Sequence, residues 1–465
     1  MEQNYIEKYE LSDSFAFNGA FHFGIGNSHM LLSSQTGTII LLDASLVKSV
    51  IKRELSDELK FKLVQRGLAN YKNSRLPSNQ SEQILPKFFI IDLTQTCVMG
   101  CIYCFRHLNN DATVISDDVL DDICDYIIAY VKDNNCKRIN VQPWGGEPLL
   151  AFEKAKRMSK RFRDANITAA ITIQSCGVLF SEDIVKEAQK LDIRFGVSID
   201  GAPELHNFQR PLASGKGSFD KLKNGLIVLH ENGYFRNHTT ISVVTKESIK
   251  YIEKTIPFFA NELKLHQFKF NIVKQNPLMK RCNLELSPDD VRNFAERMFN
   301  SMVELHRNGG TAVEVNISVR ILNLLKRNCG NICLSRGCMG GRKMIAFDQE
   351  GRIFTCDMTD LKDEALGSIY DNIGLVQVIE NAVKTHPFFR KKNSEKCDTC
   401  PWRFYCRGGC TSSIRYSKGE YTGEFDPIEC AYSESLYLRI VELFLTDPAL
   451  LQSLVQDELH FFDEY

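Results

Sequence analysis

Short apolar runs alternate with longer periodic stretches through the middle of the chain. Six runs have the length of a buried strand, at residues 88–93, 138–142, 167–173, 193–199, 238–244 and 268–273. Helical periodicity occupies the stretches 117–131, 151–163, 181–190, 219–232 and 246–263, and again 288–306. This alternation predicts an α/β fold in which helices cover a parallel sheet. Right-handed crossovers would curl the six repeats into a partial (β/α)6 barrel, which we place at residues 87–310.

The first 70 residues follow a different pattern and predict a small α+β domain. Residues 29–32 and 37–42 are apolar on either side of a Gly-containing turn, as in a β-hairpin. Helical stretches follow near 44–55 and 57–65. The polar, proline-containing segment 71–86 is typical of a linker between this domain and the barrel.

Beyond the barrel, regular patterns fade from about residue 329 and cysteines become frequent. Nine of the sixteen cysteines lie between Cys329 and Cys430. A region with so few long apolar elements needs cross-links or metal to fold. We therefore expect a cysteine-rich domain at 311–435, followed by a C-terminal helical segment, 436–465, with a helix over 433–445.

Composition narrows the possible functions. Fifty-seven basic and 58 acidic residues give a net charge of -1, so we expect neither a nucleic-acid nor a membrane partner. The apolar runs are far shorter than the roughly 20 residues that cross a bilayer, and the polar N-terminus is unlike a signal peptide. These features predict a cytoplasmic protein, in which sixteen cysteines favour metal or cluster binding over disulfides.

The first cysteine group comes directly after the first predicted strand, at the barrel end where active sites lie. Cys97, Cys101 and Cys104 have the spacing C-x3-C-x2-C. Three thiolates can hold three irons of a [4Fe–4S] cluster and leave the fourth iron open to a small-molecule ligand. Tyr103 and Phe105 could shield such a cluster from water. The alternative is a set of buried or zinc-binding cysteines.

With its aromatic neighbour, this spacing resembles the signature of the radical S-adenosylmethionine (SAM) superfamily, whose fold is a TIM-like partial barrel. The resemblance extends over residues 87–430. Gly145, Gly146, Glu147 and Pro148 follow the second strand and resemble the GGEP motif, which contacts the amino group of SAM in that family. Glycines permit close backbone approach, and a carboxylate suits an ammonium partner. The alternative for the GGEP segment is an ordinary turn. By the same resemblance we count Tyr103 among the cofactor-binding residues.

Two further strand ends resemble segments of the anaerobic sulfatase-maturating enzymes within this superfamily. Gln174 begins a QTNG-like sequence, in which Cys176 replaces the Asn. Ser198 and Asp200 belong to a segment similar to S-[IM]-D-G, and Arg210 follows it. The resemblance implies that Gln174, Ser198 and Asp200 help to bind SAM. Alternatively, Asp200 and Arg210 form a buried structural ion pair.

The downstream cysteines resemble the seven-cysteine pattern of the SPASM domain found in peptide- and protein-modifying radical SAM enzymes. The resemblance implies two auxiliary [4Fe–4S] clusters, hence three clusters in the chain, and Cys333 or Cys329 can supply the eighth auxiliary ligand that four thiolates per cubane require. It assigns the first cluster to Cys333, Cys338, Cys356 and Cys410, and the second to Cys397, Cys400, Cys406 and Cys430. One or two zinc sites are the alternative, since C-x2-C pairs also suit zinc.

Asp357 directly follows Cys356 in a stretch similar to the sulfatase-maturating enzymes. The resemblance implies that Asp357 is a general base that takes a proton as a radical intermediate is oxidised. The alternative is an Asp that only anchors a turn.

Together these features predict a radical SAM oxidoreductase that modifies a peptide. SPASM proteins mostly act on peptides, and an N-terminal extension often grips the leader of a ribosomally made precursor by β-augmentation. We expect a maturase that installs a thioether, carbon–carbon or ether cross-link, with an electron donor such as flavodoxin or ferredoxin. The alternatives are an anaerobic sulfatase-maturating enzyme that forms formylglycine, and a non-enzymatic iron–sulfur or zinc protein.

Overall fold

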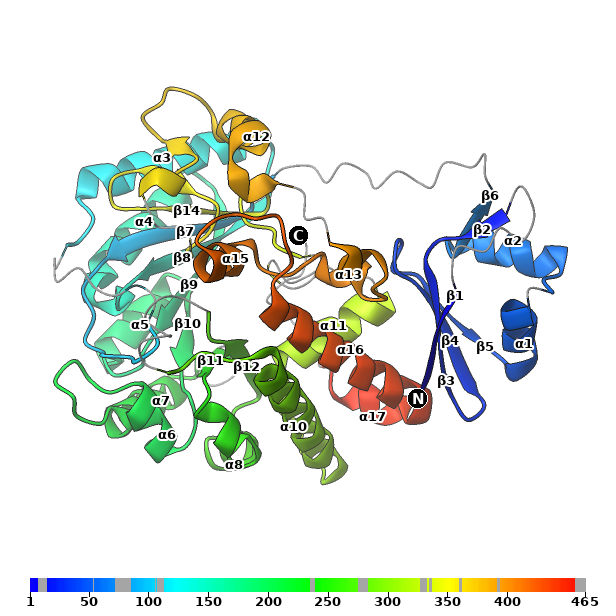
Figure 1. Cartoon of the computed structure of the whole chain (residues 1–465). Helices are drawn as coiled ribbons and strands as arrows, with labels where there is room; N and C mark the ends of the chain where they lie inside the picture. Colours follow the sequence, from blue (N-terminus) through cyan, green and yellow to red (C-terminus); the bar gives the residue numbers. More distant parts are fainter. Residues whose placement is uncertain are drawn as a thin grey trace.

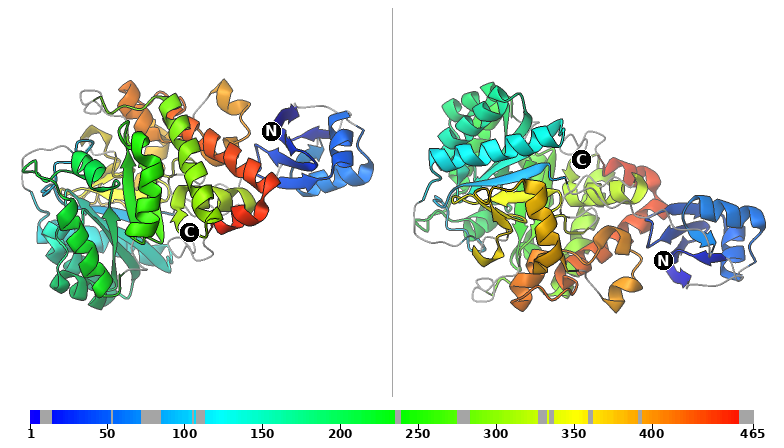
Figure 2. Two further views of the ribbon diagram at one scale, coloured as in Figure 1. Left: turned by 90° about the horizontal axis from the view of Figure 1, so that it is seen from below. Right: turned by 90° about the horizontal axis from the view of Figure 1, so that it is seen from above.

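The computed structural model describes residues 1–6, 15–52, 54–71, 85–104, 106, 113–234, 239–274, 283–326, 333, 337–358, 362–390 and 394–455. A large α/β unit lies at one end of the molecule and a small, mostly β domain at the other (Figure 1). The C-terminal helices lie between the two (Figure 2).

The large unit is built on a parallel sheet, as the strand–helix alternation predicts. Its six central strands are β7 (Phe88–Thr94), β8 (Arg138–Gly145), β9 (Thr168–Ser175), β10 (Ile193–Ser198), β11 (Thr239–Val244) and β12 (Gln267–Ile272), in that spatial order and all parallel. The predicted α/β barrel is therefore confirmed.

The sheet continues at both ends beyond the expected barrel. β13 (Val313–Glu314) pairs in parallel with β12, and β14 (Met344–Phe347) pairs in parallel with β7. β15 (Arg352–Phe354) and β16 (Gly367–Ser368) then add antiparallel strands, which gives ten strands in all. Residues expected to belong only to the cysteine-rich domain thus extend the barrel sheet.

Helices cover one face of the barrel strands. They are α3 (Asp117–Asp133), α4 (Phe152–Asp164), α5 (Glu182–Lys190), α6 (Pro203–Gln209), α7 (Phe219–Glu231) and α10 (Pro288–Arg307), with the one-turn helix η1 (Pro148–Ala151) before α4. Side chains alternate between the two faces of a strand. On β9, Ile171 and Ile173 enter the main apolar core, whereas Gln174 lies on the opposite, barrel-interior face.

The expected continuous helix at 246–263 is wrong. Three short segments replace it, namely η3 (Ser248–Tyr251), α8 (Ile252–Pro257) and the π-helical η4 (Phe258–Glu262). Pro257 ends α8; a proline has no backbone N–H to donate to the preceding turn, and the backbone widens there into a π turn.

The cysteine-rich region contains more regular structure than expected. Its helices are α11 (Val315–Lys326), α12 (Leu375–Thr385), α13 (Glu395–Asp398), α14 (Arg403–Cys406), α15 (Thr411–Lys418), α16 (Pro427–Thr446) and α17 (Pro448–Ser453), with short turns η5 (Lys362–Glu364) and η6 (Pro387–Phe389). The expected boundary at residue 436 falls inside α16. That helix begins at Pro427, because the Asp426 carboxylate accepts hydrogen bonds from the backbone N–H groups of Ile428 and Glu429.

The N-terminal domain combines a four-stranded antiparallel sheet with two helices. The sheet order is β1 (Glu2–Ile6), β3 (Ala20–Ile25), β4 (Ser28–Ser33) and β5 (Ile39–Leu42). The expected hairpin is β4–β5, and the expected helices are α1 (Ala44–Lys52) and α2 (Asp57–Gln65). A separate pair, β2 (Phe15–Phe17) with β6 (Ala69–Tyr71), reaches the start of the expected linker, of which residues 72–84 lie outside the described residues.

Aromatic side chains join this domain to the C-terminal region. The ring of Phe23 on β3 stacks on Trp402 at 5.4 Å, and Trp402 stacks in turn on Tyr437 of α16 at 5.1 Å. The Tyr405 hydroxyl donates a 2.8 Å hydrogen bond to the carbonyl of Gly37, between β4 and β5. The small domain is therefore fixed to the segment that links Cys400 to Cys406.

In the part of the chain that the structure describes, no helix combines the length and the apolar character that a membrane crossing requires.

We predict that Gly37→Ala loosens the contact between the two domains. Gly37 has φ +65°, and an added Cβ would overlap the Phe404 ring. We expect the free energy of docking between the two domains to fall by about 1–3 kcal/mol. Hydrogen exchange in β4 and β5 should therefore be faster, and the fluorescence of Trp402 should change.

Gly26→Ala is a matched control, because Gly26 has a similar φ of +58° but open space around the position of a Cβ. Gly26→Ala also places an alanine in the left-handed backbone conformation, at the same cost in free energy, but without an overlap with a neighbouring side chain. Equal effects of the two variants would contradict the proposed contact.

Candidate functional site

The loop that carries the first three cysteines follows β7 and is held by a second loop. Met99 forms an isolated antiparallel bridge with Leu212. Three backbone hydrogen bonds complete the junction: Gly100 N to Pro211 O (2.8 Å), Ala213 N to Val98 O (2.9 Å) and Ile102 N to Gln209 O (3.0 Å). The thiols are therefore carried on a backbone fixed along most of its length.

This loop brings Cys97, Cys101 and Cys104 within electrostatic reach of one another, as their spacing predicts. Burial raises the pKa of Cys97 to about 11 and that of Cys101 to about 12, so both are protonated thiols near neutral pH until a metal displaces the protons. The Arg210 guanidinium lies 3.8 Å from the Cys101 sulfur and opposes this rise. A cation at this position favours thiolates.

Gly145, the last residue of β8, and Gly146 allow the segment that follows the strand to lie against the cysteine loop. Gly146 N donates to Thr94 O at 2.7 Å, and Glu147 N donates to Thr96 O at 2.9 Å. A Cβ on Gly145 would overlap Thr94 O, and one on Gly146 would overlap Thr96 O. Because Thr96 immediately precedes Cys97, the glycines place Glu147 beside the cysteine loop.

Glu147 is buried and anchored by the end of β9. Its Oε1 accepts hydrogen bonds from the Ser175 hydroxyl (2.9 Å) and Leu149 N (3.2 Å), and its Oε2 accepts one from Cys176 N (2.8 Å). Burial raises the pKa of Glu147, and these donors oppose the rise. The Cys176 thiol also hydrogen-bonds to this carboxylate and lies within electrostatic reach of Cys97.

Gln174 and Ser198 lie side by side at the ends of β9 and β10. The Gln174 side-chain amide donates to the Ser198 hydroxyl at 3.2 Å. The absence of a side chain at Gly196 makes room for Gln174, because a Cβ there would overlap the Gln174 amide. The structure thus brings these predicted cofactor residues together on the interior face of the barrel.

Asp200 is bound on all sides by protein groups. One oxygen, Oδ2, lies 2.6 Å from the Tyr103 hydroxyl, 2.9 Å from the Gln209 amide and 3.1 Å from Nε of Arg210. The other, Oδ1, accepts from Val243 N at 2.9 Å. These contacts favour the structural ion pair between Asp200 and Arg210, which the sequence left open. Asp200 and Tyr103 therefore position the cysteine loop. Direct contact of Asp200 or Tyr103 with SAM stays a prediction.

Sequence reasoning missed Gln209, which completes this network. Its amide donates to Asp200 and to Val243 O, and its carbonyl oxygen accepts from the hydroxyls of Thr245 and Ser248. A lone Gln beside Arg210 carries no motif. Its role depends on the approach of the loops after β10 and β11, which the sequence does not reveal.

The predicted first auxiliary set brings together cysteines as far apart in the chain as Cys333 and Cys410. Cys333 lies within electrostatic reach of Cys338 and Cys410, and Cys356 lies within reach of the same two thiols. Cys356 is buried, and its sulfur is 3.4 Å from the Ser412 hydroxyl. Cys329, the rival eighth ligand, lies outside the described residues.

The predicted second set is also brought together. Cys400 lies within electrostatic reach of Cys397 and Cys430, and Cys406 within reach of Cys400 and Cys430. Burial raises the pKa of both Cys400 and Cys406 to about 12. All eight thiols thus fall into the two groups of four that the SPASM resemblance implies, and their role as ligands stays a prediction.

Among the other described cysteines, Cys124 is fully buried in the core on α3. Within the described ranges, no three Cys, His, Asp or Glu side chains gather closely enough to hold one metal ion. Ligands of a cubane bind different irons and stand farther apart than those of a single ion, so the spread of the two sets is compatible with cubanes.

An apolar cluster joins the barrel interior to the first auxiliary set. Ile90 of β7 and Trp144, which immediately precedes Gly145, belong to the same cluster as Phe354, Cys356 and Met358. Asp357 lies between the last two and acts electrostatically on Cys356 and Cys333. The predicted general base therefore lies beside the first auxiliary set.

Comparison with known proteins agrees with this geometry. The family model of the Radical SAM superfamily matches residues 91–259. The cysteine-type anaerobic sulfatase-maturating enzyme of Clostridium perfringens (strain 13) is 25% identical over 326 residues, which cover 68% of this chain and 85% of that protein. The serine-type enzyme of Bacteroides thetaiotaomicron is 24% identical over 351 residues, 69% of this chain and 81% of that protein.

Two solved structures share the fold. Native anSMEcpe with bound AdoMet and a peptide superposes with a TM-score of 0.65 at 22% identity, over 79% of this chain and 98% of that one. Streptococcus suis SuiB bound to its precursor peptide SuiA superposes with a TM-score of 0.54 at 14% identity, over 90% of this chain and 98% of that one.

We predict that Glu147→Gln weakens SAM binding while the iron content stays unchanged. The substitution keeps the size of the side chain but removes the charge that would bind an ammonium group. A charge-assisted hydrogen bond is worth about 1.5–3 kcal/mol, so the Kd for SAM should rise about ten- to hundredfold. Equilibrium dialysis with labelled SAM measures this Kd, and an unchanged value would remove Glu147 from the cofactor site.

Proposed function

Because this chain belongs to the radical SAM superfamily, we propose that it is a peptide maturase that installs a cross-link in a ribosomally made precursor. The observation that carries the proposal is the N-terminal domain, whose sheet is docked on the segment linking two cysteines of the second auxiliary set. The chain is an enzyme related to the anaerobic sulfatase-maturating enzymes. The cross-linking reaction is the part of its function that we propose.

Members of this superfamily use a [4Fe–4S] cluster and SAM, and the residues present suit both groups. Cys97, Cys101 and Cys104 would hold the cluster through three thiolates. Glu147 would bind the ammonium group of SAM, and Gln174 with Ser198 would contact it from the neighbouring strand ends. When bound and reduced, the cluster would supply the electron that splits SAM into methionine and a 5′-deoxyadenosyl radical.

The protein positions these groups and excludes water from them. The Asp200 network fixes the cysteine loop, and the close approach of Gly145 and Gly146 fixes Glu147 against that loop. On the side of the auxiliary set, Trp144 and Ile90 close the site with apolar surface. A reactive carbon radical survives only in such an enclosed space.

The proposed reaction balances as a two-electron oxidation of the peptide. One reducing electron, from a donor such as flavodoxin or ferredoxin, is used to cleave SAM. The peptide gives one hydrogen atom to the 5′-deoxyadenosyl radical, and then loses one proton and one electron as the new bond forms. Asp357 would take the proton, and the auxiliary clusters, if all eight cysteines are ligands, would provide an acceptor for the electron.

The edge strand β5 offers a place for the leader of the precursor. No described strand pairs with its outer edge. Leu41 on β5 is 62% exposed, and Ile51 on α1 and Phe61 on α2 are 51% and 56% exposed. An extended leader with apolar side chains could add a strand at this edge by β-augmentation.

The second candidate is an anaerobic sulfatase-maturating enzyme. The sequence identity to both the cysteine-type and the serine-type enzymes favours it, as does the position of Asp357 beside the first auxiliary set. Formylglycine formation is also a two-electron oxidation, so the chemistry of the site alone does not separate the two functions. The third possibility, a non-enzymatic iron–sulfur or zinc protein, would bind metal without cleaving SAM.

The test combines reconstituted full-length enzyme, reductant and SAM with peptides encoded by neighbouring genes. We expect 5′-deoxyadenosine and a peptide product about 2 Da lighter for each cross-link, because two hydrogens are lost. A variant that lacks residues 1–71 should lose this activity and keep the release of 5′-deoxyadenosine.

The outcomes separate the candidates. Formation of formylglycine on a sulfatase-motif peptide, at the same rate with and without residues 1–71, would support the sulfatase-maturating function instead. Bound zinc with no cleavage of SAM would support the scaffold protein.

We predict that Asp357→Asn separates cleavage of SAM from peptide modification. The amide cannot accept the proton that the peptide loses, so product formation should fall about 10²- to 10⁴-fold. Release of 5′-deoxyadenosine should fall much less. The neighbouring Asp363→Asn is the control, since Asp363 lies on the short turn η5 and is exposed; an equal loss in both variants would argue against a general base at Asp357.

A further inference from the structure

A cavity of about 170 Å³ lies where the last barrel strand meets the cysteine-rich region. Its walls come from the end of β12, the start of α10, one face of α15 and the start of α16. The apolar residues that line it are Ile272, Val273, Leu286, Pro288, Pro427 and Ile428. An apolar cavity of about this size can hold a benzene molecule, so this one has room for a leucine-sized or aromatic side chain.

The charged groups of the cavity are balanced by other protein groups. The Asp426 carboxylate caps α16, where it accepts hydrogen bonds from Ile428 N at 3.0 Å and Glu429 N at 3.2 Å. The Glu429 carboxylate is paired with the Arg320 guanidinium at 2.9 Å. Lys274, the one cation among the lining residues, lies within electrostatic reach of both carboxylates. The lining charges therefore need no further ion, and the rest of the wall favours an apolar guest.

Helix α15 forms one side of the cavity from its mouth to its floor. Ser413 and Ser417 both line the cavity and, being four positions apart, lie on the same face of this helix. Ser413 is buried, whereas Ser417 is exposed, and the Ser417 hydroxyl donates to Ile414 O at 3.1 Å. The cavity therefore opens to solvent beside Ser417 and closes at Ser413.

The closed end of the cavity lies near the predicted proton acceptor. The hydroxyl of Ser412, which precedes Ser413 in α15, is 3.4 Å from the Cys356 sulfur, and Asp357 follows Cys356. Because the barrel strands are parallel, the end of β12 lies at the same edge of the sheet as Glu147. A peptide with one residue in the barrel would therefore pass this cavity with a neighbouring residue.

We propose that the cavity binds one apolar side chain of the substrate peptide, leucine-sized or aromatic, and so sets which residue of the peptide enters the barrel. The inference deepens the proposed function and rests on it for a peptide as the substrate. Removing a large apolar side chain from water stabilises the bound peptide, whereas a small or charged side chain gains nothing from an apolar wall.

The experiment is a double-mutant cycle between full-length reconstituted enzyme and the precursor peptide encoded by a neighbouring gene. Each large apolar residue of the peptide is replaced by Ala in turn. One replacement should lower kcat/KM about 10- to 100-fold, because the side chain that fills the cavity is lost. Ser417→Phe adds a ring at the mouth of the cavity and should lower kcat/KM for the original peptide by a similar factor. The sensitive peptide variant should lose nothing further in Ser417→Phe, because both changes remove the same contact.

Lys418→Phe is the matched control. It adds the same ring at the next position of α15, but Lys418 is exposed and does not line the cavity. Its kcat/KM for the original peptide should stay within about twofold of that of the unsubstituted enzyme, as for most surface changes. Ser417→Phe should also keep the iron content and the Kd for SAM, which separates loss of the cavity from damage to the metal and cofactor sites.

Three results would overturn the inference while the proposed function stands. They are an unchanged kcat/KM in Ser417→Phe, a loss in Ser417→Phe that adds fully to that of every peptide variant, and an equal loss in Lys418→Phe. Failure of the proposed function gives a different result, namely formylglycine on a sulfatase-motif peptide and no cross-link in the precursor. The same cycle on the sulfatase-motif peptide then decides the inference. A chain that cleaves SAM but modifies neither peptide rejects both.

Discussion

The arrangement of the strand ends that carry the candidate site depends on one buried carboxylate, that of Asp200. Asp200 follows β10, yet it binds Tyr103 from the loop after β7, Gln209 and Arg210 from the segment after its own strand, and Val243 from β11. A charge removed from water must be paired and fully hydrogen-bonded to be tolerated, and here its partners come from three strand ends. Because the Asp200 carboxylate needs all of these hydrogen-bond partners, it fixes how the three strand ends meet. Because Arg210 also reaches the Cys101 sulfur, the same requirement places a cation against the thiols.

A similar constraint operates in the C-terminal region, where buried polar groups lie within the main apolar core. α11 and α16 are joined by Arg320, whose guanidinium lies 2.9 Å from Glu429 and stacks over Tyr432 at 4.8 Å. The two auxiliary sets interleave along the chain, since Cys410 of the first lies between Cys406 and Cys430 of the second. Metal binding at both would therefore tie distant segments together, in addition to the apolar core that they share with the barrel.

The elements that could be predicted are those with a local signal. The barrel strands and their helices were found because each strand is a compact apolar run and each helix has one apolar face. α11 was missed because most of its residues are buried, Asn316, Ser318 and Arg320 among them, so it has no polar face to mark its period. The Pro257 break was missed because the apolar period continues through it. Among site residues, the cysteines and GGEP have fixed spacings, whereas Gln209 and Trp144 acquire their positions only from packing between distant segments.

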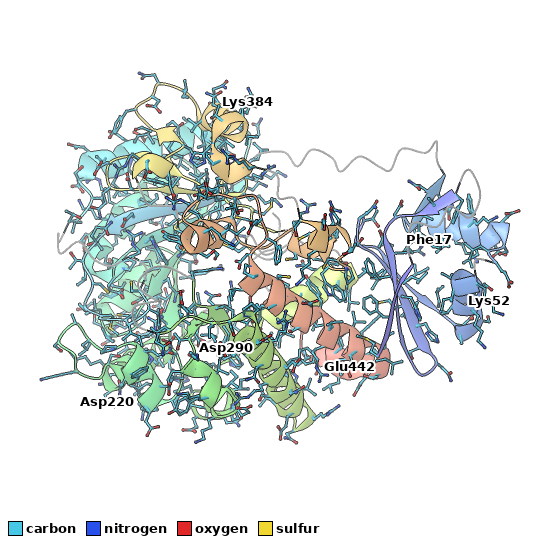
Figure 3. The ribbon with its side chains drawn as sticks, viewed as in Figure 1. Phe17, Lys52, Asp220, Asp290, Lys384 and Glu442 are labelled. Carbon is cyan, nitrogen blue, oxygen red and sulfur yellow. The ribbon has the colours of Figure 1, made fainter. Side chains whose placement is uncertain are left out.

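The spatial order of the parts explains why a peptide substrate suits this molecule. The barrel interior contacts the first auxiliary set through Trp144 and Cys356. The first set adjoins the second along the chain at Cys406 and Cys410, and the segment that ends at Cys406 holds the N-terminal domain through Tyr405 and Gly37. Figure 3 shows Asp220 and Asp290 on the barrel side of the molecule, Glu442 on the C-terminal helices between, and Phe17 and Lys52 at the far end in the small domain. A small molecule held in the barrel would have no use for a distant docking edge. Under the proposed function a precursor peptide would use both sites: its leader would bind at β5 while its reacting residue enters the barrel, and an extended chain can bridge separate sites at about 3.3 Å per residue.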